Sequence, residues 1–249
     1  MRRVTTAVLL ASLSATPSQG QSITAGTQGP GPAGFNCGMF LCSPDGVEVE
    51  QLYSSALFQD PFSIASLTFF LSSAPEGYTG GMPYTGQTFD IYLSTTAATV
   101  AGISRVFTDN IGADQTLFAT VTLAGPTGPA GSELTIEGET PYSYFPANGN
   151  LLLNVFVHGA LPNIPPGEQS FFAAAVNDPN MVRVFNLGGV PSPNGWTDAM
   201  LDEPSSTLVT RFNGVTATPE PATLGLFATG LLFLGGMIVA RRRSRASIV

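Results

Sequence analysis

The feature that most constrains the fold of this chain is a series of short apolar–polar alternations separated by clusters of glycine and proline. In residues 88–93, for example, Phe89, Ile91 and Leu93 alternate with polar side chains, which is the period of a strand with one buried face. Turn clusters at 74–77, 124–129 and 146–150 divide such segments, and no long helical pattern lies between them. The sequence therefore predicts an all-β fold, a single antiparallel β-sandwich or jelly-roll-like domain. About nine strands are expected, at residues 47–53, 64–71, 88–93, 117–123, 134–136, 151–157, 171–176, 181–187 and 207–212.

Both ends of the chain depart from this pattern. Arg2 and Arg3 precede a short apolar run at 4–13, and small residues follow at 18 and 20, so residues 1–20 are predicted to be a Sec signal peptide. Near the other end, residues 222–240 carry no charge and would extend roughly 28 Å as a helix, close to the hydrocarbon thickness of a bilayer. This run is predicted to be a single transmembrane helix.

Basic residues follow the apolar run directly, as Arg241, Arg242 and Arg243. By the positive-inside rule they form a membrane stop in a cytoplasmic tail at 241–249, which places the preceding domain across the membrane. The order Pro219-Glu220-Pro221, helix and arginines resembles the PEP-CTERM sorting signal of Gram-negative bacteria, a tail also known as an ice-binding protein C-terminal domain.

That resemblance covers only about residues 216–245. It implies recognition by an exosortase, a membrane-embedded processing enzyme. It also implies a protein anchored in the inner membrane with its ectodomain in the periplasm, then passed to the outer surface or the medium. Links to exopolysaccharide and biofilm are implied as well.

These boundaries predict six parts. They are a signal peptide (1–20), a Gly/Pro-rich leader (21–45), a β-sandwich domain (46–212), a spacer with the Pro-Glu-Pro element (213–221), the transmembrane helix (222–240) and the basic tail (241–249).

The exported region is strongly acidic. Residues 21–217 hold three arginines, no lysine and sixteen acids, a net charge of about −13. Such a charge repels nucleic acids and anionic membrane surfaces, which excludes them as partners. It suits a soluble extracellular protein and is compatible with a bound divalent cation.

The two cysteines of the chain, Cys37 and Cys42, lie close together in the leader. In an exported protein an even count favours a disulfide, and one closing so short a loop contributes about 2 kcal/mol. The alternative, a metal or redox pair, lacks two further ligands and the C-x-x-C spacing.

No set of catalytic residues stands out. His158 is the only histidine, and no serine lies in a G-x-S-x-G motif. Glu133 and Glu137 would lie about 13 Å apart on one strand, too far for a glycosidase pair. Glu137 and Glu139 are closer, yet the alternation of Glu133, Thr135 and Glu137 with Leu134 and Ile136 is typical of a solvated sheet face. The chain is therefore predicted not to be an enzyme.

Two kinds of ligand site remain as candidates. Loop carboxylates at Asp109, Asp114, Asp198 and Asp202 offer oxygens for calcium, although neither loop has the EF-hand pattern. No other cofactor is expected. Threonines lack the regular repeat that ice binding would require.

Rings near turns, at Trp196, Tyr142 and Tyr144, are candidates for stacking on a glycan. This requires that they share one exposed face, and burial of the rings would remove the site. The leading hypothesis is a non-enzymatic surface or matrix protein. The alternatives are a carbohydrate-binding module, with or without calcium, and a glycan-directed hydrolase, which two convergent buried carboxylates in a cleft would support.

Overall fold

The computed structural model describes residues 21–29, 35–36, 45–72, 84–125, 128–159, 171–186, 191–201 and 204–215. The strands in these ranges are β1 (Ser22–Ala25), β2 (Phe35–Asn36), β3 (Glu48–Tyr53), β4 (Phe62–Ser72), β5 (Tyr84–Thr96), β6 (Thr116–Gly125), β7 (Glu133–Tyr144), β8 (Asn150–His158), β9 (Phe171–Val176), β10 (Met181–Phe185), β11 (Ser206–Leu208) and β12 (Thr210–Val215). Helical structure there is limited to α1 (Phe107–Asn110) and 3₁₀ turns at Ser55–Leu57, Val100–Gly102, Pro146–Asn148 and Asp198–Leu201.

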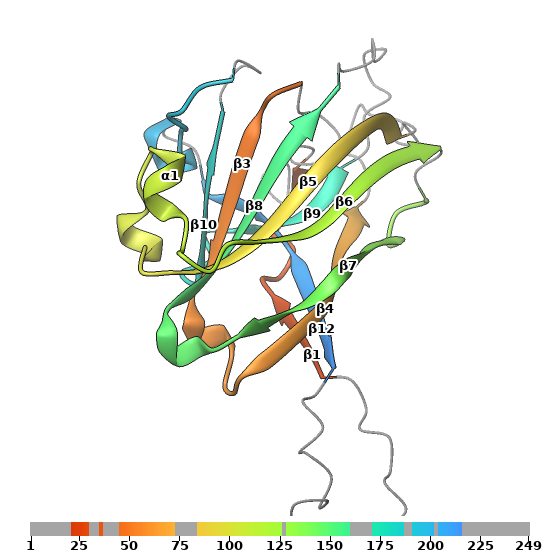
Figure 1. Cartoon of the computed structure of the whole chain (residues 1–249). Helices are drawn as coiled ribbons and strands as arrows, with labels where there is room; N and C mark the ends of the chain where they lie inside the picture. Colours follow the sequence, from red (N-terminus) through yellow and green to blue (C-terminus); the bar gives the residue numbers. More distant parts are fainter. Residues whose placement is uncertain are drawn as a thin grey trace, which may run out of the picture. The chain divides into compact units, whose positions relative to one another are not determined.

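The strands form two antiparallel sheets (Figure 1). The seven-stranded sheet has the order β1-β12-β4-β9-β11, with β7 beside β4 and β2 beside β9. The five-stranded sheet has the order β10-β3-β8-β5-β6. The predicted all-β, antiparallel class is confirmed.

One hydrophobic core joins the two sheets. The alternation of each strand turns one set of side chains inward: Phe89, Ile91 and Leu93 of β5 and Phe69 and Phe212 from the other sheet are all fully buried. The inward aromatic rings pack edge to face, as Phe212 does against the Tyr53 ring, 4.9 Å away. The period-2 alternation of the sequence therefore correctly predicted which side chains of these strands lie in the core.

Every one of the nine predicted segments overlaps a strand, but the sheet begins earlier in the chain than residue 46. β1 lies in the segment predicted as a leader, and it pairs with β12 from Ser22↔Asn213 to Ala25↔Thr210. Ala25 is fully buried. Four residues are too short for a visible alternation, and the pairing partner lies at the other end of the domain.

Among the described residues, no helix is long and apolar enough to cross a membrane. The predicted signal peptide, the span at 222–240 and the tail at 241–249 lie outside them.

Candidate functional site

A carboxylate cluster lies on the outer face of the five-stranded sheet. Because Val49 and Leu153 point into the core, their neighbours Glu48, Glu50 and Asn154 point to the opposite face. The Asn154 Nδ2 donates to Glu48 Oε1 at 2.8 Å and to Glu50 Oε1 at 3.2 Å. Since both oxygens bond one nitrogen, they lie at most about 6.0 Å apart.

Glu50 is the deepest member of this cluster. It is fully buried, and its Oε2 accepts a 2.7 Å hydrogen bond from Asn110 Nδ2 of α1. Burial raises the pKa of Glu50 to about 8, and the charge of Glu48 acts in the same direction, against the hydrogen bonds from Asn110 and Asn154. The pKa of Glu48 is also raised, by burial.

The cluster meets one half of the hydrolase criterion. Its two carboxylates converge on the Asn154 amide nitrogen. Glu50, however, has no exposed surface, so it does not reach a substrate in this structure.

Sequence analysis missed the cluster because Glu48-Val49-Glu50 has the alternation of an ordinary solvated face. The α1 segment covers this part of the sheet, and Asn110 lies 60 positions beyond Glu50. No local sequence pattern near Glu50 predicts its contact with Asn110.

An open region of the same face adjoins the cluster on β5 and β8. Asp90 Oδ2 lies 2.8 Å from His158 Nε2, and Asp90 Oδ1 accepts a 2.7 Å bond from Thr120 Oγ1. The Thr120 hydrogen bond, and then His158, lower the pKa of Asp90. The rings of Tyr92 and Phe156 lie 6.0 Å apart, edge to face, and both are partly exposed.

Two of the predicted glycan-contact rings are buried. Tyr142 is 6% exposed and Tyr144 is 0% exposed. The Tyr142 hydroxyl donates to Asp114 Oδ2 at 2.8 Å, and the Tyr144 hydroxyl donates to the Gly149 carbonyl at 2.7 Å. Trp196 is partly exposed, with the Arg105 guanidinium 5.0 Å from its ring centroid. The three rings thus do not share an exposed face, the condition on which a stacking role for Tyr142 and Tyr144 depended.

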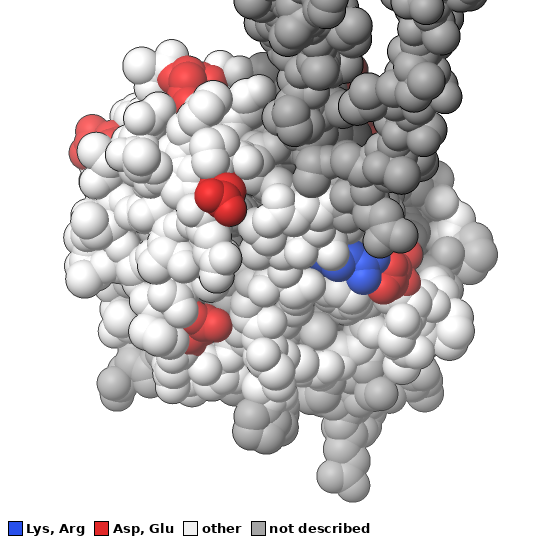
Figure 2. All heavy atoms as spheres, turned by 90° about the horizontal axis from the view of Figure 1, so that it is seen from below, with Lys and Arg blue, Asp and Glu red and all other residues white. Residues whose placement is uncertain are grey.

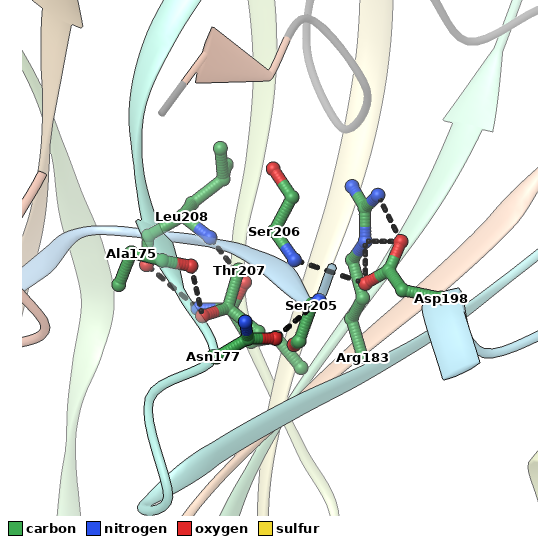
Figure 3. Close-up of polar contacts among 9 residues, drawn as sticks. Ala175, Asn177, Arg183, Asp198, Ser205, Ser206, Thr207 and Leu208 are labelled. Atoms are coloured by element: carbon green, nitrogen blue, oxygen red, sulfur yellow. Dashed lines mark hydrogen bonds and ion pairs between the residues drawn. The ribbon is translucent and has the colours of Figure 1, made fainter. Parts of the chain in front are cut away.

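The loop carboxylates proposed as calcium ligands lie apart from one another and already bond to other residues. Asp198 is buried and pairs with both Nε and Nη2 of Arg183, and Figure 3 shows the Ser206 N–H pointing at the same carboxylate. Asp114 accepts from Thr95 N and from a tyrosine hydroxyl.

The remaining calcium candidates add no cluster. Asp109 accepts from Ser104 Oγ, and Asp202 lies outside the described residues. Within the described ranges, no three His, Cys, Asp or Glu side chains gather where a metal ion could be held. Cys37 and Cys42 lie outside these ranges, so their pairing stays a prediction.

The positive charges of the described region all have partners. Arg183 pairs with Asp198, Arg211 with Glu133, and Arg105 lies over Trp196. In Figure 2, acidic side chains are spread over the visible face, and the basic side chain there adjoins an acidic one. The protein therefore presents no basic surface in this region.

The sorting residues Pro219, Glu220, Pro221 and the stop at 241–243 lie outside the described residues, but the comparison with protein families identifies them. Residues 217–243 match the family model of the PEP-CTERM protein-sorting motif. No curated protein and no solved structure matches the chain. The chain thus carries a PEP-CTERM protein-sorting motif, and the motif marks it for export and membrane-associated sorting by an exosortase.

Proposed function

Because the chain carries this sorting motif, we propose that it is a non-enzymatic protein of the cell surface or extracellular matrix, associated with exopolysaccharide and biofilm. The motif at 217–243 carries the proposal. In this scheme a Sec signal exports the chain, residues 222–240 hold it in the inner membrane with its ectodomain in the periplasm, and exosortase processing passes it to the outer surface or medium.

The ectodomain supports a role without catalysis. In the described part of the chain, the carboxyl pair of Glu48 and Glu50 is closed off at Glu50, and the only histidine of the sequence is an exposed partner of Asp90. Its acidity and its engaged arginines favour a soluble protein that does not adhere to anionic polymers.

The test is replacement of Pro219, Glu220 and Pro221 by alanine, in cells that contain the cognate exosortase. Immunoblots of membrane and released fractions should show a full-size, membrane-retained variant, whereas the wild type is shortened and released. The matched control replaces Thr216 and Thr218, which precede the Pro-Glu-Pro element, by alanine and should be processed normally. Unchanged mature size and release in the Pro-Glu-Pro variant would contradict the proposal.

A further inference from the structure

Tyr142 and Tyr144 are buried, but the outer face of the five-stranded sheet carries two other aromatic rings that are partly exposed. In Figure 1, β8, β5 and β6 form the front of the molecule, while α1 lies on the β10 side of the same sheet. Register places Phe156 of β8 directly between Glu48 of β3 and Asp90 of β5. In the next row, Asn154 lies between Glu50 and Tyr92.

The resulting arrangement is two rings flanked by fixed hydrogen-bond acceptors. Phe156 and Tyr92 are partly exposed, and their edge-to-face contact holds both rings in place. Asn154 fixes Glu48 through Oε1, and within the described residues nothing donates to Glu48 Oε2. His158 and Thr120 fix Asp90.

A further acceptor below the rings lacks a donor. Asn154 Oδ1 is buried and has no hydrogen-bond partner in the described part of the chain. An unpaired buried oxygen is unfavourable, and a bound water could supply the missing donor.

These properties define the chemistry of a ligand. Ring faces suit the apolar C–H faces of sugars, and carboxylates accept from sugar hydroxyls. The charge of this face narrows the class of ligand further. Glu48 and Asp90 lie beside the rings, and the described arginines contact other residues. An anionic polysaccharide would be repelled, whereas a neutral one would not.

We propose that this face, formed by Glu48, Asp90, Tyr92 and Phe156, binds a neutral polysaccharide. The sugar chain lies across β8 and β5, with sugar rings on Phe156 and Tyr92 and hydroxyls donating to Glu48 and Asp90. The inference extends the proposed matrix role by naming a ligand class, but it does not depend on how the chain is sorted. Glu50 supports Glu48 from below and does not touch the sugar.

The test uses the full-length chain in a detergent without a sugar headgroup, since glycoside detergents would compete. Affinity electrophoresis is run through gels containing a soluble β-1,4-glucan, a β-1,3-glucan, a mannan or a polyuronate. The wild type should be retarded by at least one neutral polymer and not by the polyuronate. Phe156→Leu keeps apolar volume but removes the ring, and should weaken binding about tenfold. Glu48→Gln, which preserves shape, should weaken it as well.

Two control variants, each lacking an aromatic ring outside this face, test whether binding depends on this face. Phe145→Ala removes a 49% exposed ring outside the face, and Trp196→Ala removes the partly exposed ring predicted from sequence. Both should bind as the wild type does. Retardation lost in Trp196→Ala but kept in Phe156→Leu would overturn the proposal, as would binding of the polyuronate alone or of no polymer. Release of reducing ends by the wild type but not by Glu50→Gln would replace binding with hydrolysis. A failure of sorting would be detected only in the cell-fractionation experiment, and a failure of sugar binding only in the gels. The two proposals can therefore be contradicted separately.

Discussion

The Gln51 carboxamide of β3 is hydrogen-bonded twice to the main chain of Leu208 in the opposite sheet. Its Nε2 donates to the Leu208 carbonyl at 2.8 Å, and its Oε1 accepts from the Leu208 N–H at 2.7 Å. The same Nε2 reaches the Tyr53 hydroxyl, which is bonded to Thr210 Oγ1. All these groups are buried, so a polar link joins the two sheets through the apolar core.

Removing this polar link between the sheets should lower the free energy of unfolding. Gln51→Leu leaves the Leu208 N–H buried without its acceptor, while the Leu208 carbonyl keeps its hydrogen bond from Thr210 Oγ1. We expect a loss of about 1–3 kcal/mol in the free energy of unfolding. Urea denaturation measures it. Gln115→Leu is the control, because Gln115 is exposed, and its change should stay within about 0.5 kcal/mol. Equal effects of the two substitutions would show that the cross-sheet bonds contribute nothing.

Stability should fall as the pH rises, because of Glu50. Its folded-state pKa of about 8 lies above the ordinary glutamate value of 4.5, so the folded protein holds the proton more tightly than the unfolded chain. The contribution is complete below pH 4.5, decreases up to about pH 8 and is constant above. The slope from this single group approaches about 1.4 kcal/mol per pH unit.

Glu50→Gln, which resembles the protonated acid, should flatten this dependence and be the more stable form at pH 8. Urea denaturation of both proteins between pH 5 and pH 9 checks it. Glu137→Gln, at an exposed position of β7, should keep the wild-type slope. Parallel curves for the wild type and Glu50→Gln would show that Glu50 does not bind the proton in the folded state.

Asp198 should be a stability residue. Asp198→Ala leaves the Arg183 guanidinium, which is itself largely buried, without its ion-pair partner and removes the carboxylate that accepts from the Ser206 N–H. We expect a loss of about 3–5 kcal/mol and a lower Tm, measured by thermal denaturation. The exposed Asp60, changed to alanine, serves as the control. A Tm for Asp198→Ala equal to that of Asp60→Ala would contradict the role.

Tyr142 should matter for stability and not for sugar binding. Tyr142→Phe removes hydroxyl contacts to Asp114 and Thr95, and should cost about 1 kcal/mol. Because the ring is only 6% exposed, retardation in polysaccharide gels should stay unchanged. Weakened retardation without a change in Tm would restore this ring as a ligand contact.

Local alternation predicted strands well and predicted the environment of their outer faces poorly. Glu133, Leu134 and Thr135 alternate in the same way as Glu48, Val49 and Glu50. Yet Glu133 is exposed and pairs with Arg211, while Glu50 has no accessible surface. The difference arises from α1, a distant segment that covers one sheet face and not the other.

The same limit explains the aromatic residues. Period 2 places Tyr142 and Tyr144 on one side of β7, but it does not say which side faces the core. Tyr92 and Phe156 are far apart in sequence and become neighbours only through the pairing of β5 with β8. The sorting motif, in contrast, is a short contiguous signal, and sequence alone was sufficient to find it.

β12 has a mechanical consequence for a tethered protein. It is the last strand before the sorting motif, and it is hydrogen-bonded to β1 on one side and to β4 on the other. A pull on the chain beyond Val215, directed along the strand, would load both ladders in shear at once. Many parallel bonds would then have to break together, so the domain would resist unfolding by a force applied at this end.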